Sequence, residues 1–373
     1  MTVSISGTGG VTFNDSSVQD TAATGFGFKN RIINGAMVIS QRGTSFAGLT
    51  NGSNQYTVDR WRWAESGTFT GVQTVTKDSS APSGFTASLK VETTTAVASL
   101  ASGESCRVEQ MIEGYNIADL AWGTADAKSI TLSFWARSSL TGTFGGGISN
   151  SDTNRSYPFT YSISAANTWE YKTVVVSGDT TGTWLADSGV GMRVRFGLGV
   201  GSTLSGTAGA WAAADYQSAT GAVSVVGTSG ATFYVTGVQL EKGSTATSFD
   251  YRPYGTELAL CQRYYFKMLP ASGSQAFGVG FNDSTTAARA VAQFPVVMRT
   301  SPTALEQTGT AGDYQIRFTG GAATTCSSVP SFSDSNPYTA TFIFTVASGL
   351  TGGQASLSRA VNSTAFLAWS AEL

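Results

Sequence analysis

The chain has 373 residues, with 22 Lys and Arg, 24 Asp and Glu, 44 Gly and no histidine. Charged residues make up 12% of it, against about 25% in an average globular protein. The absence of histidine excludes Ser-His-Asp triads, Cys-His pairs and histidine-ligated zinc sites. The 21 Phe, 13 Tyr and 8 Trp supply ample core material, so the chain is not a disordered one.

Charge and hydropathy argue against two classes of partner. The net charge is −2 and no stretch concentrates Lys and Arg, so we expect no nucleic-acid partner. The longest apolar runs are far shorter than the ~20 residues of a membrane span, and residues 1–20 lack the pattern of a signal peptide, so we expect a soluble protein with no membrane insertion. Cys106, Cys261 and Cys326 have neither disulfide-framework nor metal-site spacing.

Composition divides the chain into three units. Residues 1–28 form a weakly alternating hairpin that is too short to bury a face by itself and must dock on something. Residues 29–250 contain many segments with period-two alternation, separated by Gly, Ser, Thr and Asn turns, which predicts an antiparallel β-sandwich of the jelly-roll type. The clearest strand is residues 129–137, where Ile130, Leu132 and Phe134 share a core face.

Two other parts of this middle unit give local predictions. Residues 171–176 and 233–240 are apolar on both faces, which is typical of central strands. Residues 116–122 predict one helical turn.

The third unit, residues 251–373, begins with the best helical segment. Residues 256–268 predict a short helix on which Leu258, Cys261, Tyr265 and Met268 trace one stripe. A helix of this length is marginal alone, so the stripe packs either on its own sandwich or on copies from other chains. Strands resume after Gly278 and predict a second, smaller C-terminal β-sandwich.

Short motifs follow one another in a definite order along the chain. They are VTFNDSSVQDTA at residues 11–22, NRIINGAM at 30–37, SQRG at 40–43, YTVDRW at 56–61, EQMIEG at 109–114, SFWAR at 133–137, GVQLEKG at 237–243 and ELALCQRYY at 257–265. The series resembles the fibre and fibre-like virion proteins of tailed bacteriophages, especially marine and cyanobacterial ones. In those proteins the middle part is a jelly roll similar to a carbohydrate-binding module. The first motif departs from the resemblance at Ser16, where Gly is usual.

The resemblance implies a structural, non-enzymatic tail fibre that mediates recognition of host-surface polysaccharide or protein. It implies a homotrimer located on the virion, made in the host cytoplasm and attached to other tail or capsid proteins through its N-terminus. It favours the helix stripe as the trimer interface. The attachment residues that it implies are Phe13, Asp15, Val18 and Gln19. One alternative is a head fibre or capsid decoration protein, and a second is a polysaccharide depolymerase.

Glycan contacts are sought among the tryptophans, because binding modules lay aromatic faces against sugar rings. Trp135 with Arg137 is the preferred candidate, since both lie opposite the core face of their strand. Trp61 and Trp63, which share one strand face, are further candidates. For any single tryptophan the favoured alternative is that it fills the sandwich or a subunit interface.

Carboxylates give the remaining chemical hypotheses. Glu109 and Glu113 would share a strand face, as a glycosidase pair could, although a structural role is favoured and no catalytic residue is assigned. Asp59 and Asp250 could contribute oxygen ligands to Ca²⁺, by analogy with carbohydrate-binding jelly rolls. That signal is weak, so the sequence predicts no cofactor and no defined metal site.

Overall fold

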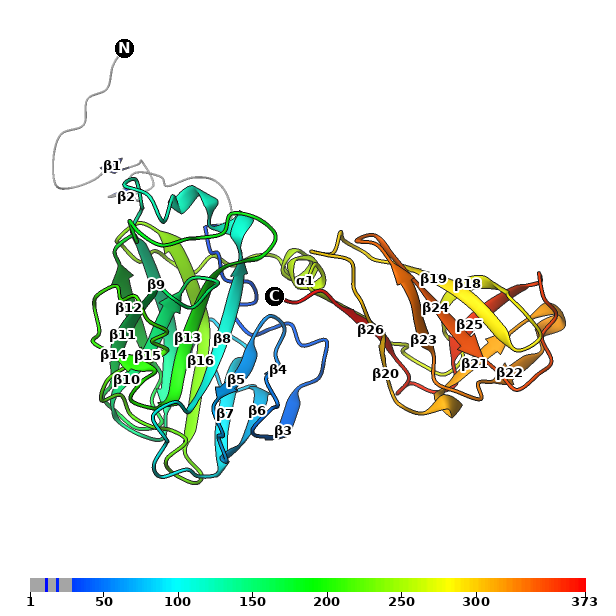
Figure 1. The fold of residues 1–373 in the computed structure, drawn as a ribbon, viewed down its shortest axis with the longest axis horizontal. Coiled ribbons are helices and arrows are strands. Elements are labelled where there is room, and N and C mark those ends of the chain that lie inside the picture. The colour runs from blue at the N-terminus through cyan, green and yellow to red at the C-terminus, as the bar shows by residue number, and fades with distance from the viewer. Residues whose placement is uncertain (1–10, 13–17, 20–28) are drawn as a thin grey trace, which may run out of the picture.

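The computed structural model describes residues 11–12, 18–19 and 29–373. Strands β1 (Val11–Thr12) and β2 (Val18–Gln19) pair antiparallel. The proposed attachment residues Phe13 and Asp15 lie outside the described residues. The described chain is mostly β and antiparallel, with two sandwich domains on either side of one short α-helix, as Figure 1 shows. The predicted fold class is therefore confirmed.

The first domain, here called the jelly-roll domain, consists of two six-stranded antiparallel sheets. Sheet 1 has the order β11 (Ser156–Ile163), β10 (Gly142–Ser149), β13 (Val190–Val200), β8 (Ser105–Glu113), β5 (Arg62–Ser66) and β4 (Gln55–Tyr56). Sheet 2 has the order β12 (Glu170–Val176), β9 (Ile130–Ser138), β16 (Thr232–Lys242), β7 (Ser88–Thr95), β6 (Val72–Asp78) and β3 (Ser45–Leu49). Short connecting elements are η1 (Gly114–Asn116), η2 (Ala118–Leu120), β14 (Ser205–Gly206) and β15 (Ser218–Ala219).

The core of the jelly-roll domain lies between its two sheets. Alternating residues of β9, including Leu132 and Phe134, are fully buried there, as the period-two pattern predicts. The prediction of a central strand is right for β16 and wrong for β12, which is an edge strand with Tyr171 and Val175 exposed. The apolar residues of β12 led to a wrong prediction, because an edge strand can also carry aromatic and β-branched side chains on its open face. The predicted helical turn is a pair of 3₁₀ turns, η1 and η2.

The second domain, here called the C-terminal domain, packs a seven-stranded sheet against a three-stranded one. The larger sheet has the order β22 (Ala323–Thr325), β21 (Tyr314–Arg317), β25 (Ala355–Ala360), β18 (Ala276–Asn282), β19 (Ala287–Gln293), β24 (Thr339–Thr345) and β23 (Ser331–Ser335). The smaller has the order β17 (Tyr265–Met268), β26 (Leu367–Ser370) and β20 (Glu306–Gln307). Two 3₁₀ turns, η3 (Ala311–Asp313) and η4 (Thr319–Gly321), complete the domain.

The helix at the domain junction is shorter than predicted. Helix α1 (Tyr254–Gln262) ends before Tyr265 and Met268, which lie in β17 and pair with β26. The predicted stripe of Leu258, Cys261, Tyr265 and Met268 therefore does not lie on one helix. After Gln262 the pairing of strands overrides the local helical periodicity. Cys261 and Tyr265 are buried within the chain itself, and Leu258 packs partly against the Cys261 cluster. The homotrimer stays a prediction, but these four residues do not form the helical interface that was expected for it.

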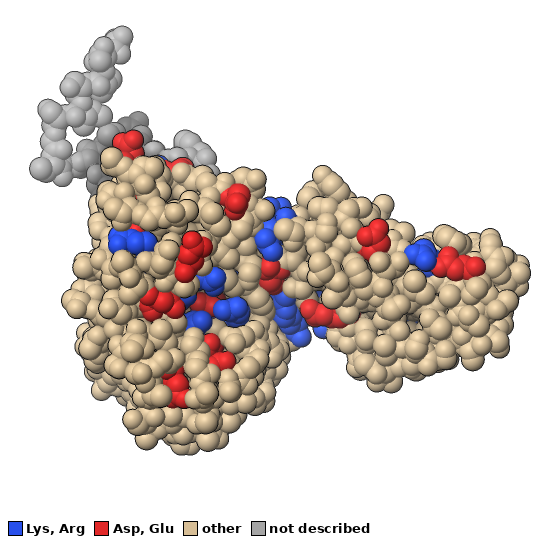
Figure 2. Space-filling view, in the orientation of Figure 1, with Lys and Arg blue, Asp and Glu red and all other residues tan. Residues whose placement is uncertain are grey.

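Charged side chains gather where the two domains meet, as Figure 2 shows on one face of the molecule. Glu113 at the end of β8 accepts hydrogen bonds from Arg263 Nη2 at 2.6 Å and from the Tyr264 hydroxyl at 2.6 Å. Glu372, next to β26, forms ion pairs with Arg60 and Arg42 of the jelly-roll domain. These pairs are largely shielded from water and hold the two domains in one arrangement.

Candidate functional site

Three aromatic rings from separate segments pack together at the surface of the jelly-roll domain. Phe85 lies between β6 and β7, whereas Phe249 and Tyr251 follow β16. Ring centroids are 4.8 Å apart for Phe249 and Tyr251, and 5.1 and 5.5 Å from Phe85 to these two. The Tyr251 hydroxyl donates to the Gly84 carbonyl at 2.8 Å, which fixes a ring that is 59% exposed. We call Phe85, Phe249 and Tyr251 the aromatic trio.

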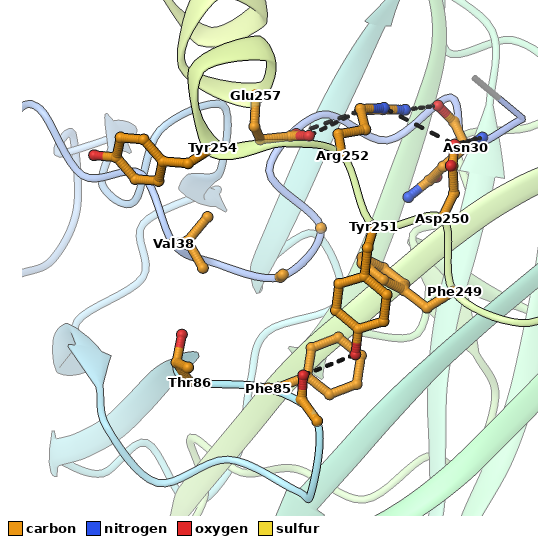
Figure 3. A pocket seen from close by; sticks show the side chains of 13 residues that line it. Asn30, Val38, Phe85, Thr86, Phe249, Asp250, Tyr251, Arg252, Tyr254 and Glu257 are labelled. Atoms are coloured by element: carbon orange, nitrogen blue, oxygen red, sulfur yellow. Dashed lines mark hydrogen bonds and ion pairs between the residues drawn. The ribbon is translucent and has the colours of Figure 1, made fainter. Parts of the chain in front are cut away.

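A pocket of about 240 Å³ lies beside the aromatic trio. Figure 3 shows the rings of Tyr251 and Tyr254 on opposite sides of this pocket, with Val38 between them and Thr86 nearby. Tyr254 is the first residue of α1 and is 64% exposed. Two open aromatic faces above an aliphatic floor suit the apolar face of a sugar ring. We call this space the tyrosine pocket.

Charged groups at the back of the tyrosine pocket are largely paired within the chain. Arg252 forms an ion pair with Glu257 at 3.2 Å and donates to the Asn30 carbonyl (Figure 3). Asp250 Oδ2 accepts the backbone N–H groups of Lys29 at 3.0 Å and Asn30 at 3.2 Å. Asp250 Oδ1 accepts no hydrogen bond from any described residue. That oxygen can therefore accept one from a ligand hydroxyl.

A second hollow, of about 500 Å³, lies on the other side of the aromatic trio, on the outer face of sheet 2. Trp135 on β9 and Tyr171 on β12 line it as cross-strand partners. Gly237 lies where the pairing of β16 with β9 shifts register, and its φ is +60°. A Cβ at Gly237 would lie 2.7 Å from the Phe85 ring and 3.1 Å from the Trp135 ring, so glycine lets both rings approach the backbone. We call this space the tryptophan hollow.

The tyrosine pocket and the tryptophan hollow share the aromatic trio as a common wall. Together they form one surface that we call the aromatic groove. Its rings come from strands, loops and the helix start, and they are Phe85, Trp135, Tyr171, Phe249, Tyr251 and Tyr254. A row of aromatic faces with hydroxyl and carboxylate groups beside it can bind successive sugar units of one polysaccharide chain.

Of the preferred pair of predicted glycan contacts, Trp135 and Arg137, only the tryptophan lines the groove. Arg137 lies on the same face of β9, but its Nη1 donates to Ser80 Oγ at 2.7 Å and its guanidinium lies 4.9 Å from the Tyr234 ring centroid.

Trp61 and Trp63 require a correction as glycan contacts. Both are fully buried between the two sheets, where they pack against Phe196 and Phe69. A large aromatic side chain at a core position contributes to burial and leaves no face for a ligand. The alternative interpretation, that these tryptophans fill the sandwich, is confirmed.

Glu109 and Glu113 are both closed to a substrate. Glu109 is fully buried and accepts hydrogen bonds from Arg62 at 2.9 Å and from Arg107 and Arg195 at 3.2 Å. Burial alone would raise the pKa of Glu109, but the three guanidinium groups outweigh it and hold that pKa well below its usual range. A general acid needs a raised pKa, so this environment is the opposite of the one that a general acid requires.

The proposed calcium ligands also have internal partners. Asp59 accepts hydrogen bonds from the backbone and side-chain nitrogens of Gln41 at 2.8 and 2.6 Å, and burial raises the pKa of its carboxyl group. Among the described residues no three Asp, Glu or Cys side chains cluster as metal ligands would. In the same part of the chain, no helix is long and apolar enough to span a membrane.

Sequence reasoning missed most of the aromatic groove. Phe249, Tyr251 and Tyr254 lie within six residues of one another, in a stretch that has no period-two pattern and contains Pro253. Aromatic residues that follow neither a strand nor a helix periodicity do not belong to a predicted buried face. That density of rings in an irregular segment was the available signal.

Comparisons with known proteins identify no family for this chain, and no curated protein sequence matches it. Solved structures similar to it include the enzymatically active domain of tailspike protein 4 from bacteriophage CBA120, with 14% identity and a TM-score of 0.28 over 52% of this chain and 21% of that one. A putative sugar binding protein from Bacteroides thetaiotaomicron has 13% identity and a TM-score of 0.33 over 57% of this chain and 100% of that one.

A family 11 carbohydrate-binding module from Clostridium thermocellum, in complex with a β-1,3-1,4-mixed-linked tetrasaccharide, is a third similar structure. It has 9% identity and a TM-score of 0.27 over 54% of this chain and 98% of that one. All three TM-scores are below 0.5, so function has to be inferred from this chain's own residues.

Proposed function

We propose that this protein binds polysaccharide in the aromatic groove of its jelly-roll domain and that it catalyses no reaction on the bound chain. The observation that carries the proposal is the pair of tyrosines on opposite sides of the tyrosine pocket, with Tyr251 59% and Tyr254 64% exposed. A single exposed tyrosine is common, whereas several aromatic rings gathered on one concave surface are typical of a binding site. Here they border a concave surface with an available carboxylate oxygen on Asp250.

The binding test compares tyrosines that are equally exposed. Tyr254→Ala and Tyr251→Ala should each weaken polysaccharide binding by about 1 to 2 kcal/mol, roughly 5- to 30-fold in Kd, because each removes a stacking face. Tyr338→Ala is the matched control, since Tyr338 is 62% exposed but lies in the C-terminal domain. Binding to host-surface polysaccharides would be measured on the full chain by affinity electrophoresis. Equal losses in all three variants would contradict the groove.

At the level of biology, we propose a homotrimeric tail fibre on a phage virion that adsorbs to a host surface, attached through residues 1–28. The support is the ordered motif series, which resembles fibre proteins, together with a low charge that suits subunits associating through uncharged surfaces. Mass measurement in solution tests the trimer, and labelling of the N-terminus on intact particles tests tail against head attachment. A monodisperse monomer that is absent from virions would overturn the proposed tail fibre. It would not affect the glycan-binding proposal, which the tyrosine variants test separately.

A further inference from the structure

A second pocket, of about 430 Å³, lies between the two domains and is separate from the aromatic groove. Its jelly-roll side includes Gln55 and Tyr56 of β4, and its C-terminal side includes Lys267 of β17, Ser370 of β26 and Phe366. Small-ligand pockets are often found at domain interfaces and have volumes of about 300 to 1,000 Å³. We call this space the interdomain pocket.

The walls of the interdomain pocket are held in place by contacts that cross the junction. The Arg42 guanidinium lies 3.5 Å from the Tyr265 ring centroid and 5.2 Å from that of Tyr56. Arg42 also forms an ion pair with Glu372 at 3.2 Å. The Tyr56 hydroxyl donates to the carbonyl of Leu373 at 2.7 Å. The pocket is therefore formed in advance of any ligand, which lowers the entropic cost of binding.

Lys267 is the unusual group in this pocket. Its Nζ lies 4.2 Å from the Phe366 ring centroid and makes no hydrogen bond or ion pair with any described residue. Glu306 also lines this pocket and its charge acts on Lys267, but the two form no ion pair, and Glu306 Oε2 accepts the Tyr265 hydroxyl at 2.9 Å. Asp59, the other carboxylate whose charge reaches Lys267, is bonded to Gln41. Burial lowers the pKa of the Lys267 ammonium group. A partly desolvated ammonium that lacks a direct ion pair is unfavourable, and an anion bound within hydrogen-bond distance of it would relieve that cost.

The other free polar groups of the pocket suit a hydroxylated ligand. The Gln55 amide and the Ser370 hydroxyl line it and have no side-chain hydrogen bond to any described residue. The Phe366 ring, over which the ammonium lies, adds an apolar group to the lining. An anion, hydroxyl groups and a partly apolar ring are the features of a uronic acid.

We propose that the interdomain pocket binds a uronic acid residue of a saccharide, with its carboxylate on Lys267 and its hydroxyl groups toward Gln55 and Ser370. Binding in this pocket would make the protein selective for acidic glycans. The site is independent of the aromatic groove, whose rings lie on another part of the jelly-roll domain and select no charge.

The test uses the full chain and isothermal titration calorimetry with glucuronic acid, galacturonic acid, their neutral counterparts glucose and galactose, and acetate. We expect both uronates to bind at least 10-fold more tightly than the neutral sugars and than acetate. Uronates that bind no better than the neutral sugars would overturn the role of the carboxylate, and acetate binding as tightly as uronate would overturn the role of the sugar ring.

Variants assign the binding to this pocket. Lys267→Met keeps an apolar stem and removes the charge, so it should abolish the preference for uronate. Lys128→Met removes an exposed lysine charge outside the pocket and should leave the preference unchanged. Gln55→Glu places a carboxylate on an exposed pocket residue and should weaken uronate binding at least 10-fold, which decides the matter if Lys267→Met does not fold. Uronate binding that survives Gln55→Glu and any folded Lys267→Met would overturn the proposal.

The groove variant Tyr254→Ala separates this proposal from the proposed polysaccharide function. It should leave uronate binding in the interdomain pocket unchanged while weakening binding of long polysaccharide chains. If Tyr254→Ala abolishes uronate binding as well, the uronate is bound in the groove and the interdomain site is wrong.

Discussion

Trp135 on β9 lies directly across from Tyr171 on the edge strand β12, with ring centroids 5.4 Å apart. The outer side of sheet 2 thus carries a cross-strand aromatic pair that continues the surface begun by the aromatic trio. The Cβ atoms of cross-strand partners on one face of a sheet are about 5 Å apart, so backbone pairing holds these two rings next to each other. The groove therefore rests on a rigid sheet at one end and on loops at the other.

The first prediction concerns this aromatic pair. Tyr171→Ala should weaken polysaccharide binding about 5- to 30-fold, because it removes a ring that is 46% exposed beside Trp135. Val175→Ala is the control, since Val175 is 45% exposed on the same face of β12 but lies outside the groove lining. Affinity electrophoresis would measure both. A similar loss in Val175→Ala would mean that the open sheet face, and not the groove, binds the glycan.

The second prediction concerns Gly237, whose missing side chain makes room for two rings of the groove. Gly237→Ala should lower both stability and polysaccharide binding, because its Cβ would lie 2.7 Å from the Phe85 ring in a left-handed backbone conformation. Gly230→Ala carries a similar positive φ, +76°, with no atom near the added Cβ. It should cost about 1 to 2 kcal/mol of stability and leave binding unchanged. Thermal unfolding and affinity electrophoresis together separate backbone strain from loss of the groove.

Some of this architecture could be predicted from the sequence because it depends on local pattern. Alternation in residues 129–137 gave the core face of β9, and with it the outward position of Trp135. The same reasoning failed at Tyr265, where helical spacing continued past Gln262 but the chain turns into β17 to pair with β26. Pairing with a strand about a hundred residues away has no local signature.

The aromatic groove and the interdomain pocket could not be predicted from local patterns either, because their residues come from distant parts of the chain. Phe85 and Phe249 contact each other from loops far apart in the chain, and only the packing of the sheets brings them together. Lys267 is unusual because it forms no direct ion pair with any residue that the structure describes, and no spacing in the sequence indicates that. Glu109, for which the sequence favoured a structural role, is enclosed by arginines in the fold.

The third prediction follows from the environment of Glu109. Its folded-state pKa is held below its usual 4.5, so its contribution to stability is complete above that value and is lost as the pH falls below it. Asp59 has the opposite sign, because burial raises its pKa, but it is present in both parent and variant and cancels in their difference. We therefore expect Glu109→Gln to be less stable than the parent by about 3 to 5 kcal/mol at pH 7, since it leaves buried arginines without their carboxylate.

Urea unfolding at several pH values would measure this. The stability difference between parent and Glu109→Gln should shrink as the pH is lowered from 6 to 3. Glu92→Gln is the control, because Glu92 forms only a surface ion pair with Lys90, and we expect a change of about 0.5 kcal/mol or less. A difference for Glu109→Gln that is independent of pH would show that its charge does not contribute as described.

The fourth prediction concerns the junction between the domains. Glu113 is 1% exposed and accepts hydrogen bonds from Arg263 and from the Tyr264 hydroxyl. Burial raises the pKa of Tyr264 to about 12, so this hydroxyl stays a donor well above neutral pH. Glu113→Gln removes the charge that binds Arg263 and should cost about 3 kcal/mol or more. Because this contact joins β8 to the segment after α1, the two domains should then unfold separately.

Differential scanning calorimetry distinguishes this outcome from simple destabilisation. We expect one transition for the parent chain and two for Glu113→Gln, the first at lower temperature. Asp334→Asn removes an exposed carboxylate in β23, away from the junction, and should keep the single parental transition. If Glu113→Gln also unfolds in one transition at the parental temperature, the buried contact does not couple the domains. The coupling would then have to come from the ion pairs of Glu372 with Arg42 and Arg60.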